Sequence, residues 1–199
     1  MSAAAVLRKG RIVDIVEKQY LTARREMGFI VEGEGYKTIN ICGQNVAIMV
    51  GNDLAHLSEI DSKIDFVINV NSRRYGKGLM SRRLETMRRL SYTQGCSIAI
   101  INQVGGSGDL VYDGTSGILN KQGQIELIMK SFEEDFAIYD TSIEHTPIEI
   151  PYTSYNDRTR LVYKAACLGL RDYFVKNGYK KACVGLSGGI DSAVVACMA

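Results

Sequence analysis

The sequence lacks the features of a secreted, membrane-bound or metal-clustered protein. Its five cysteines form neither a CxxC pair nor a cluster with the two histidines, and an odd number cannot all be paired in disulfides. No apolar run is long enough to span a bilayer, and residues 1–5 lack the cationic flank of a signal peptide. The net charge of +2 is too small to indicate a nucleic acid or a membrane as partner. We therefore expect a cytoplasmic protein with free thiols.

Proline is also scarce, and both prolines, Pro147 and Pro151, lie in one stretch that also contains Thr, Ser and Glu. This composition is typical of a linker and predicts a domain boundary at 140–155. The chain has 199 residues, of which 46% are hydrophobic, and this suits one globular domain plus a piece of a second. The sequence thus predicts a first domain at 1–139 and the start of another at 156–199.

Short β-rich runs separated by glycine turns dominate the first domain. They predict three hairpins and three further strands, at 4–18, 37–50, 117–129, 65–70, 97–101 and 132–139. One amphipathic helix is expected at 78–92, with Met80, Leu84 and Met87 on its apolar face. Its arginines favour a solvated face or a subunit contact, because no aromatic residues are interleaved as in nucleic-acid binding. This pattern predicts an α/β layered domain with a mixed sheet.

The most informative stretch lies near the end of the chain. After a helix expected from a cap at Asn156 or Asp157 to Lys176, residues 181–185 form an apolar run. The run leads into Gly185, Leu186, Ser187, Gly188, Gly189, Ile190, Asp191 and Ser192. This order predicts a strand, a tight loop and a helix start. Glycine backbone, serine hydroxyls and free helix N–H groups all suit phosphate oxygens. A glycine-rich turn without a ligand is the alternative, because the Lys of the usual P-loop is absent.

The hexapeptide 187–192 resembles the pyrophosphate loop of the N-type ATP pyrophosphatases. Two earlier runs extend the likeness: Ile-Asn-Val-Asn-Ser at 68–72, followed by Gly76-Lys77, and Asn-Gln-Val-Gly-Gly-x-x-Asp-Leu-Val-Tyr-Asp-Gly-x-Ser at 102–116. Together they resemble glutamine-dependent NAD synthetase, which joins a nitrilase-superfamily amidase domain to an ATP pyrophosphatase domain. The resemblance implies a partial nitrilase-like α-β-β-α domain with a mixed sheet, followed by the first helix, strand and loop of a doubly wound nucleotide domain.

The resemblance also implies a reaction with small-molecule substrates. The family's amidase releases ammonia from glutamine, its second domain adenylates nicotinate adenine dinucleotide with ATP, and ammonia displaces AMP. ATP with Mg²⁺ would then lie at 185–192, with Asp191 near the cation, and a homo-oligomer is expected. Two other functions stay open. One is a non-catalytic amidase-like assembly or binding module, and the less favoured one is another ATP-pyrophosphatase amidotransferase that makes GMP or a thiolated tRNA.

Amide hydrolysis of this kind needs a cysteine thiolate, a glutamate and a lysine. Lys18 in Glu-Lys-Gln-Tyr-Leu matches the family lysine, and the family glutamate would precede Met1. Family members end the second hairpin with Ile-Cys-Glu-Asp-Leu, whereas residues 50–54 here read Val-Gly-Asn-Asp-Leu. Gly51 therefore stands at the nucleophile position, and we expect an amidase half without activity.

The remaining family positions are partly retained. Ser72 and Lys77 match a substrate-binding serine and a basic residue, while Arg24 stands where the family has a tyrosine. Cys42 precedes the Gly43-Gln44 turn, a full strand away from Gly51, and is expected to be a small buried residue rather than a substitute nucleophile. Because one helix, strand and loop cannot form a core, the terminal segment is expected to be poorly ordered, to dock on the first domain or to pair with another chain.

Overall fold

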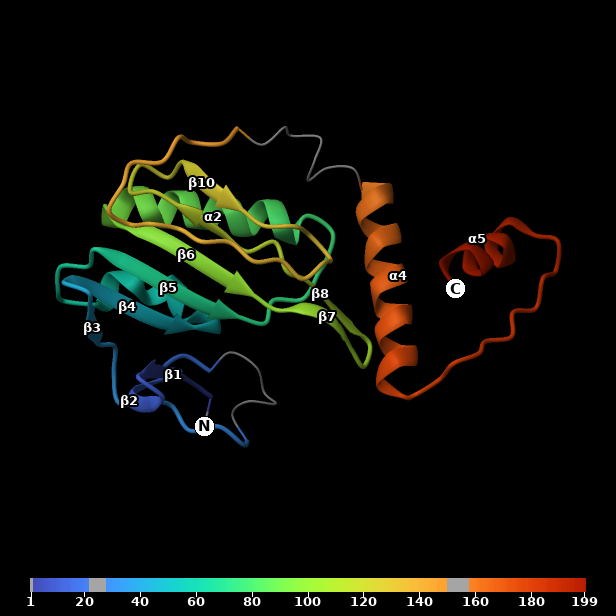
Figure 1. Ribbon diagram of the computed structural model, residues 1–199, viewed down its shortest axis with the longest axis horizontal. Coiled ribbons are helices and arrows are strands. Elements are labelled where there is room, and N and C mark those ends of the chain that lie inside the picture. The colour runs from blue at the N-terminus through green and yellow to red at the C-terminus, as the bar shows by residue number, and fades with distance from the viewer. Residues whose placement is uncertain (1, 22–27, 150–157) are drawn as a thin grey trace.

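A six-stranded mixed sheet forms the centre of the structure (Figure 1). The computed structural model describes residues 2–21, 28–149 and 158–199. In spatial order the strands are β10 (Ile125–Ile128), β9 (Gly117–Leu119), β6 (Ser97–Asn102), β5 (Phe66–Asn71), β4 (Gln44–Val50) and β3 (Thr38–Ile41). The three middle strands β4, β5 and β6 run parallel, and the outer ones pair antiparallel. The expected mixed α/β sheet is therefore confirmed.

The predicted hairpins all form, and left-handed turn residues close two of them. The turn at Lys9–Gly10, with φ values of 49° and 74°, joins β1 (Ala3–Arg8) to β2 (Arg11–Glu17). Cys42 and Gly43, with φ values of 51° and 87°, join β3 to β4. Two consecutive residues at positive φ match the twist of a two-residue hairpin. Cys42 is therefore exposed in a turn, and the expectation that it is buried was wrong.

Side chains alternate along the central strands, so both faces of the sheet bury apolar groups. On one face Met49 packs with the helix α2 (Leu79–Gln94) and with a 3₁₀ segment, η1 (Gly51–Glu59), which the sequence did not predict. On the other face Ile48 packs with Val16 of β2. Helices, the six-stranded sheet and the β1–β2 hairpin thus form successive layers (Figure 1). No described helix is both long and apolar enough to cross a membrane.

The glycine-rich run after β6 forms a further hairpin that the sequence did not predict. β7 (Val104–Ser107) and β8 (Leu110–Asp113) pair antiparallel, and the helix α4 (Arg158–Lys176) lies against them (Figure 1). A Cβ atom at Gly106 would lie 3.2 Å from the Cα atom of Gly169, so a larger residue would have to push the hairpin and the helix apart by a few tenths of an ångström. Asp172 of α4 accepts the Gly106 N–H at 2.7 Å, and Lys176 donates to the Gly106 carbonyl. The helix α4 therefore packs on the first domain through the β7–β8 hairpin.

Two expected strands do not form. Residues 132–139 run as an irregular segment, because Asp135 accepts the backbone N–H groups of Lys130 and Phe136, each at 3.0 Å, and Phe132 has a φ of 64°. Residues 181–185 are exposed coil, since no described strand offers them a ladder of backbone hydrogen bonds. The helix that follows, α5 (Ile190–Met198), forms as predicted. The expected caps at Asn156 and Asp157 and the second proline lie outside the described residues.

Candidate functional site

Lys18 and Gly51 meet at one end of the sheet. Lys18 directly follows β2, and Gly51 directly follows the parallel strand β4. A Cβ atom at position 51 would lie 3.6 Å from both Cε and Nζ of Lys18. The Lys18 residue is only 6% exposed, so solvent screens its charge weakly. The structure therefore brings the expected lysine and the nucleophile position together, although glycine supplies no attacking atom.

An asparagine fixes the backbone at this position. The side-chain amide of Asn69 on β5 donates to the carbonyl oxygens of Met49 at 3.1 Å and of Gly51 at 3.2 Å. Asn69 is fully buried and its own Oδ1 accepts a hydrogen bond from Asn71. Sequence reasoning did not assign this role, although a polar residue in the centre of an apolar strand is the signal that could have found it.

A buried carboxylate holds the segment that follows Lys18. Asp53 of η1 is 1% exposed and accepts the backbone N–H groups of Gln19 at 3.0 Å and Tyr20 at 2.8 Å. Charge-assisted bonds from backbone donors are strong in a buried setting. Asp53 therefore ties the residues next to Lys18 to the residues next to Gly51, which the sequence did not predict.

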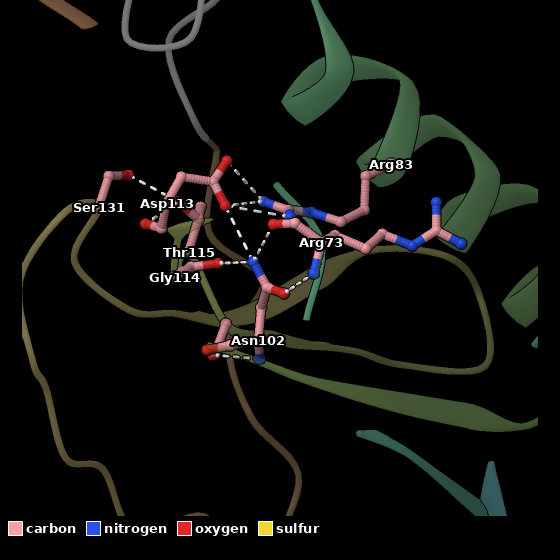
Figure 2. A network of polar contacts seen from close by, with 8 residues as sticks. Arg73, Arg83, Asn102, Asp113, Gly114, Thr115 and Ser131 are labelled. Atoms are coloured by element: carbon pink, nitrogen blue, oxygen red, sulfur yellow. Dashed lines mark hydrogen bonds and ion pairs between the residues drawn. The ribbon is translucent and has the colours of Figure 1, made fainter. Parts of the chain in front are cut away.

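A polar network lies beside the ends of β5 and β6 (Figure 2). The Arg83 guanidinium donates two bonds to Asp113 Oδ1, each at 3.1 Å, and both side chains are almost fully buried. Asn102 donates to the same oxygen at 2.9 Å and accepts the N–H of Arg73 at 2.8 Å. Burial raises the pKa of Asp113 above its usual value, although the Arg83 cation acts in the opposite direction. The network thus fixes the chain that leaves β5, on which Ser72 lies.

Ser72 and Lys77 lie in different surroundings. The Ser72 hydroxyl donates to Gln103 Oε1 at 2.8 Å, directly after the ends of β5 and β6. Lys77 instead borders a cavity shared with α4 and α5. Arg24 lies outside the described residues.

The glycine and serine loop before α5 is exposed and already folded. Ser192 Oγ donates to the Gly189 carbonyl at 2.9 Å and accepts the Ser187 N–H at 3.3 Å. Gly188 has a φ of 85°, and a Cβ atom there would meet no atom of the described residues within 4 Å. Gly189 precedes the first turn of α5, which contains Asp191. These features fit a phosphate group, because the backbone is open and the helix start offers N–H groups.

The chemistry that these groups can supply is limited. Lys18 can stabilise negative charge next to position 51, but Gly51 cannot form a covalent bond through a side chain. Within the described ranges no three His, Cys, Asp or Glu side chains converge as metal ligands. A magnesium ion at Asp191 would therefore need phosphate oxygens as further ligands, which is how Mg²⁺ commonly binds.

Comparison with known proteins first defines the class. The fold is similar to that of a nitrilase-superfamily amidase from Nesterenkonia, which aligns with a TM-score of 0.54 at 19% identity over 61% of this chain and 49% of that chain. A family model described as NAD synthase matches residues 162–199. The structure thus combines a layered domain with a fold like that of this amidase and a terminal segment that matches the NAD synthase model.

Both parts occur together in the glutamine-dependent NAD(+) synthetases. The one from Acinetobacter baylyi is 26% identical over 206 residues, covering 100% of this chain and 38% of that protein. The structure of the one from Acinetobacter baumannii, in complex with ADP, aligns with a TM-score of 0.84 at 28% identity, covering 98% of this chain and 39% of that chain. This chain is therefore a relative of the glutamine-dependent NAD(+) synthetases along its whole length, and it spans less than half the length of the relatives it matches.

Proposed function

We propose that this chain takes part in the ATP-driven amidation of nicotinate adenine dinucleotide to NAD(+), in the cytoplasm, without hydrolysing glutamine itself. The likeness to glutamine-dependent NAD(+) synthetases over 100% of the chain supports the ligase reaction. The observation that carries the second part is Gly51, since the residue at the nucleophile position beside Lys18 has no side chain that could attack glutamine. The ammonia would then come from solution rather than from an amidase step in this chain.

The loop at 185–192 is the proposed ATP site. Bound ATP would supply the adenylating chemistry, and the loop would contribute open backbone at Gly188 and Gly189 and hydroxyl donors at Ser187 and Ser192. Asp191 is the proposed side chain next to Mg²⁺. In the amidase-like part, Lys18 keeps a position suited to an oxyanion, and Ser72 remains the proposed substrate contact.

An activity assay with two nitrogen sources tests this function. The whole chain is incubated with ATP, Mg²⁺ and nicotinate adenine dinucleotide, and NAD(+) is measured with either ammonium or glutamine. We expect NAD(+) with ammonium only, and loss of that activity in Ser187→Ala or Asp191→Asn. Equal activity with glutamine, accompanied by release of glutamate, would refute the inactive amidase. No NAD(+) from either source would refute the ligase.

A labelling experiment tests the amidase half separately. An electrophilic glutamine analogue reacts with the nucleophilic thiolate of an amidase. Because Gly51 stands at that position, the analogue should add no mass to this protein. Stoichiometric labelling of Cys42 would show that another thiol serves as nucleophile.

Gly51 also favours a second candidate, a non-catalytic amidase-like assembly or binding module. Under this function the chain would form no NAD(+) with either nitrogen source and would not bind ATP in a calorimetric titration. Its role would then depend on the proposed homo-oligomer. Light scattering of the purified chain would reveal this oligomer as a molar mass above that of one chain. Exposed apolar residues on β1 and β2, including Leu7 at 68% and Ile12 at 60%, offer a surface for such assembly.

A further inference from the structure

A cavity of about 490 Å³ lies where α2, α4 and α5 approach one another. Its walls come from the start of α2 with the preceding loop, from the first turns of α4, and from α5. Met80, Leu161 and Val194 give it an apolar lining. This volume lies within the range of small-molecule sites, which are mostly apolar with a few polar groups.

The polar side chains of the cavity are all hydrogen-bond donors. They belong to Tyr75, Lys77, Thr159 and Tyr163, of which Tyr163 already donates its hydroxyl hydrogen within the chain. Among the described lining residues Lys77 alone is charged and none is acidic. Burial and the Asp113 charge raise the pKa of Tyr75, so its hydroxyl stays protonated. A cation and hydroxyl donors without a competing carboxylate complement an anion.

We propose that this cavity binds a small carboxylate with an apolar body, such as an arylalkyl acid. The apolar part would contact Met80, Leu161 and Val194, and the carboxylate would face Lys77. This inference does not depend on NAD(+) formation, because it uses neither Gly51 nor the glycine and serine loop. It also gives Lys77 a ligand different from the one that the family resemblance implies.

The bound acid would connect the two parts of the chain. Tyr163 of α4 already donates to the carbonyl of Cys197 on α5 at 3.2 Å, so α4 and α5 form one wall of the cavity. The opposite wall belongs to the layered domain through Met80, which is 3% exposed. A ligand between them would hold α5, and with it the preceding loop, against the layered domain.

Ligand-observed NMR with 4-phenylbutyrate tests the proposal on the whole chain. We expect a dissociation constant of about 0.1–1 mM, as for a ligand of this size, and at least fivefold weaker binding of the uncharged 4-phenylbutanamide. Lys77→Gln should weaken carboxylate binding about fivefold, and Lys77→Arg should retain it. Val162→Asp, on the cavity wall, should also weaken it. Lys164→Gln is the matched control, because Lys164 lies on α4 outside this cavity and pairs with Glu133.

Hydrogen exchange gives a second readout. At a concentration near its wild-type dissociation constant, 4-phenylbutyrate should slow exchange in residues 190–198 clearly more in the wild-type chain than in Lys77→Gln. Three outcomes would overturn the proposal. They are no detectable binding at a probe concentration about 10-fold above the expected dissociation constants, equal affinity for the acid and the amide, or an equal loss of affinity in Lys77→Gln and Lys164→Gln. Concentration-dependent dimerisation that excludes the probe would show that a second copy occupies the cavity instead.

Discussion

Replacing Gly51 with cysteine should create a thiol with a pKa below the usual cysteine value. A Cβ atom at position 51 would lie 3.6 Å from Lys18 Nζ, which brings the sulfur within reach of a weakly screened cation. An opposite charge at about 4–6 Å lowers a pKa by about 1–3 units. Starting from about 8.5 for a free cysteine, and allowing for the opposing effect of burial, we expect an apparent pKa of about 6.5–7.5.

The substitution should be tolerated at a moderate cost. Apart from the chain neighbours, no atom of the described residues lies closer than 3.6 Å to the added Cβ atom, so the Cβ itself makes no clash with them. Gly51 has a φ of 62°, however, and a side chain in the left-handed region costs about 1–2 kcal/mol. Gly51→Ala should lower the free energy of unfolding by a similar amount, which separates backbone strain from any effect of the thiol.

The assay is the pH dependence of alkylation by iodoacetamide, followed on the peptide that contains position 51. At pH 6 the thiol of Gly51→Cys should react about 3- to 10-fold faster than an ordinary cysteine, after allowing for the lower nucleophilicity of a more acidic thiol. Exposed Cys42 in the same protein is the internal reference. Adding Lys18→Gln should return the apparent pKa to about 8.5 or above. A normal pKa in the single variant, or one unaffected by Lys18→Gln, would refute the proposed pairing.

Three further predictions follow from other contacts. Asp113→Ala should leave the Arg83 guanidinium buried without its carboxylate and lower the free energy of unfolding by about 3–5 kcal/mol, measured by urea denaturation; a loss below about 1 kcal/mol would contradict this. Gly106→Val should force the β7–β8 hairpin away from Gly169 of α4, which faster hydrogen exchange in α4 would reveal and unchanged exchange would exclude. Cys96 is 1% exposed and burial raises its pKa to about 11, so a maleimide should label it only in urea. Labelling of Cys96 in the folded protein at the rate of an exposed thiol would disprove that.

The hairpins of the layered domain could be predicted because their information is local. Alternating side chains and turn residues that accept positive φ, such as Gly10 and Gly43, specify both the strands and their partners. The β7–β8 hairpin could not be predicted in this way, since its glycines have no alternation and its cover comes from Gly169 on a distant helix. The prediction of a strand at 181–185 was wrong for a related reason. A segment with β-propensity does not form a strand without a neighbouring strand to pair with.

The candidate site was predicted unevenly. Lys18 and Gly51 were identified by family resemblance, and the structure places them side by side. Asn69 and Asp53 were not, because their roles depend on backbone groups that only folding brings near: the carbonyl of Gly51 and the N–H of Tyr20. Sequence patterns report which residues are polar, but the partners of a buried polar group are a property of the tertiary structure.

The dependence of the β7–β8 hairpin on α4 has a consequence for synthesis on the ribosome. Residues 104–113 leave the ribosome well before residues 158–176. Until α4 has been synthesised, the hairpin therefore lacks the helix that covers Val111 and the Gly105–Gly106 pair. During that interval the six-stranded sheet can already pair, because its strands all precede residue 129. A nascent chain halted before α4 should therefore be cut by protease within 104–113 while β4, β5 and β6 stay protected. Once residues up to Lys176 have left the ribosome, protease should no longer cut within 104–113. The two parts of this chain would then begin to assemble at the hairpin.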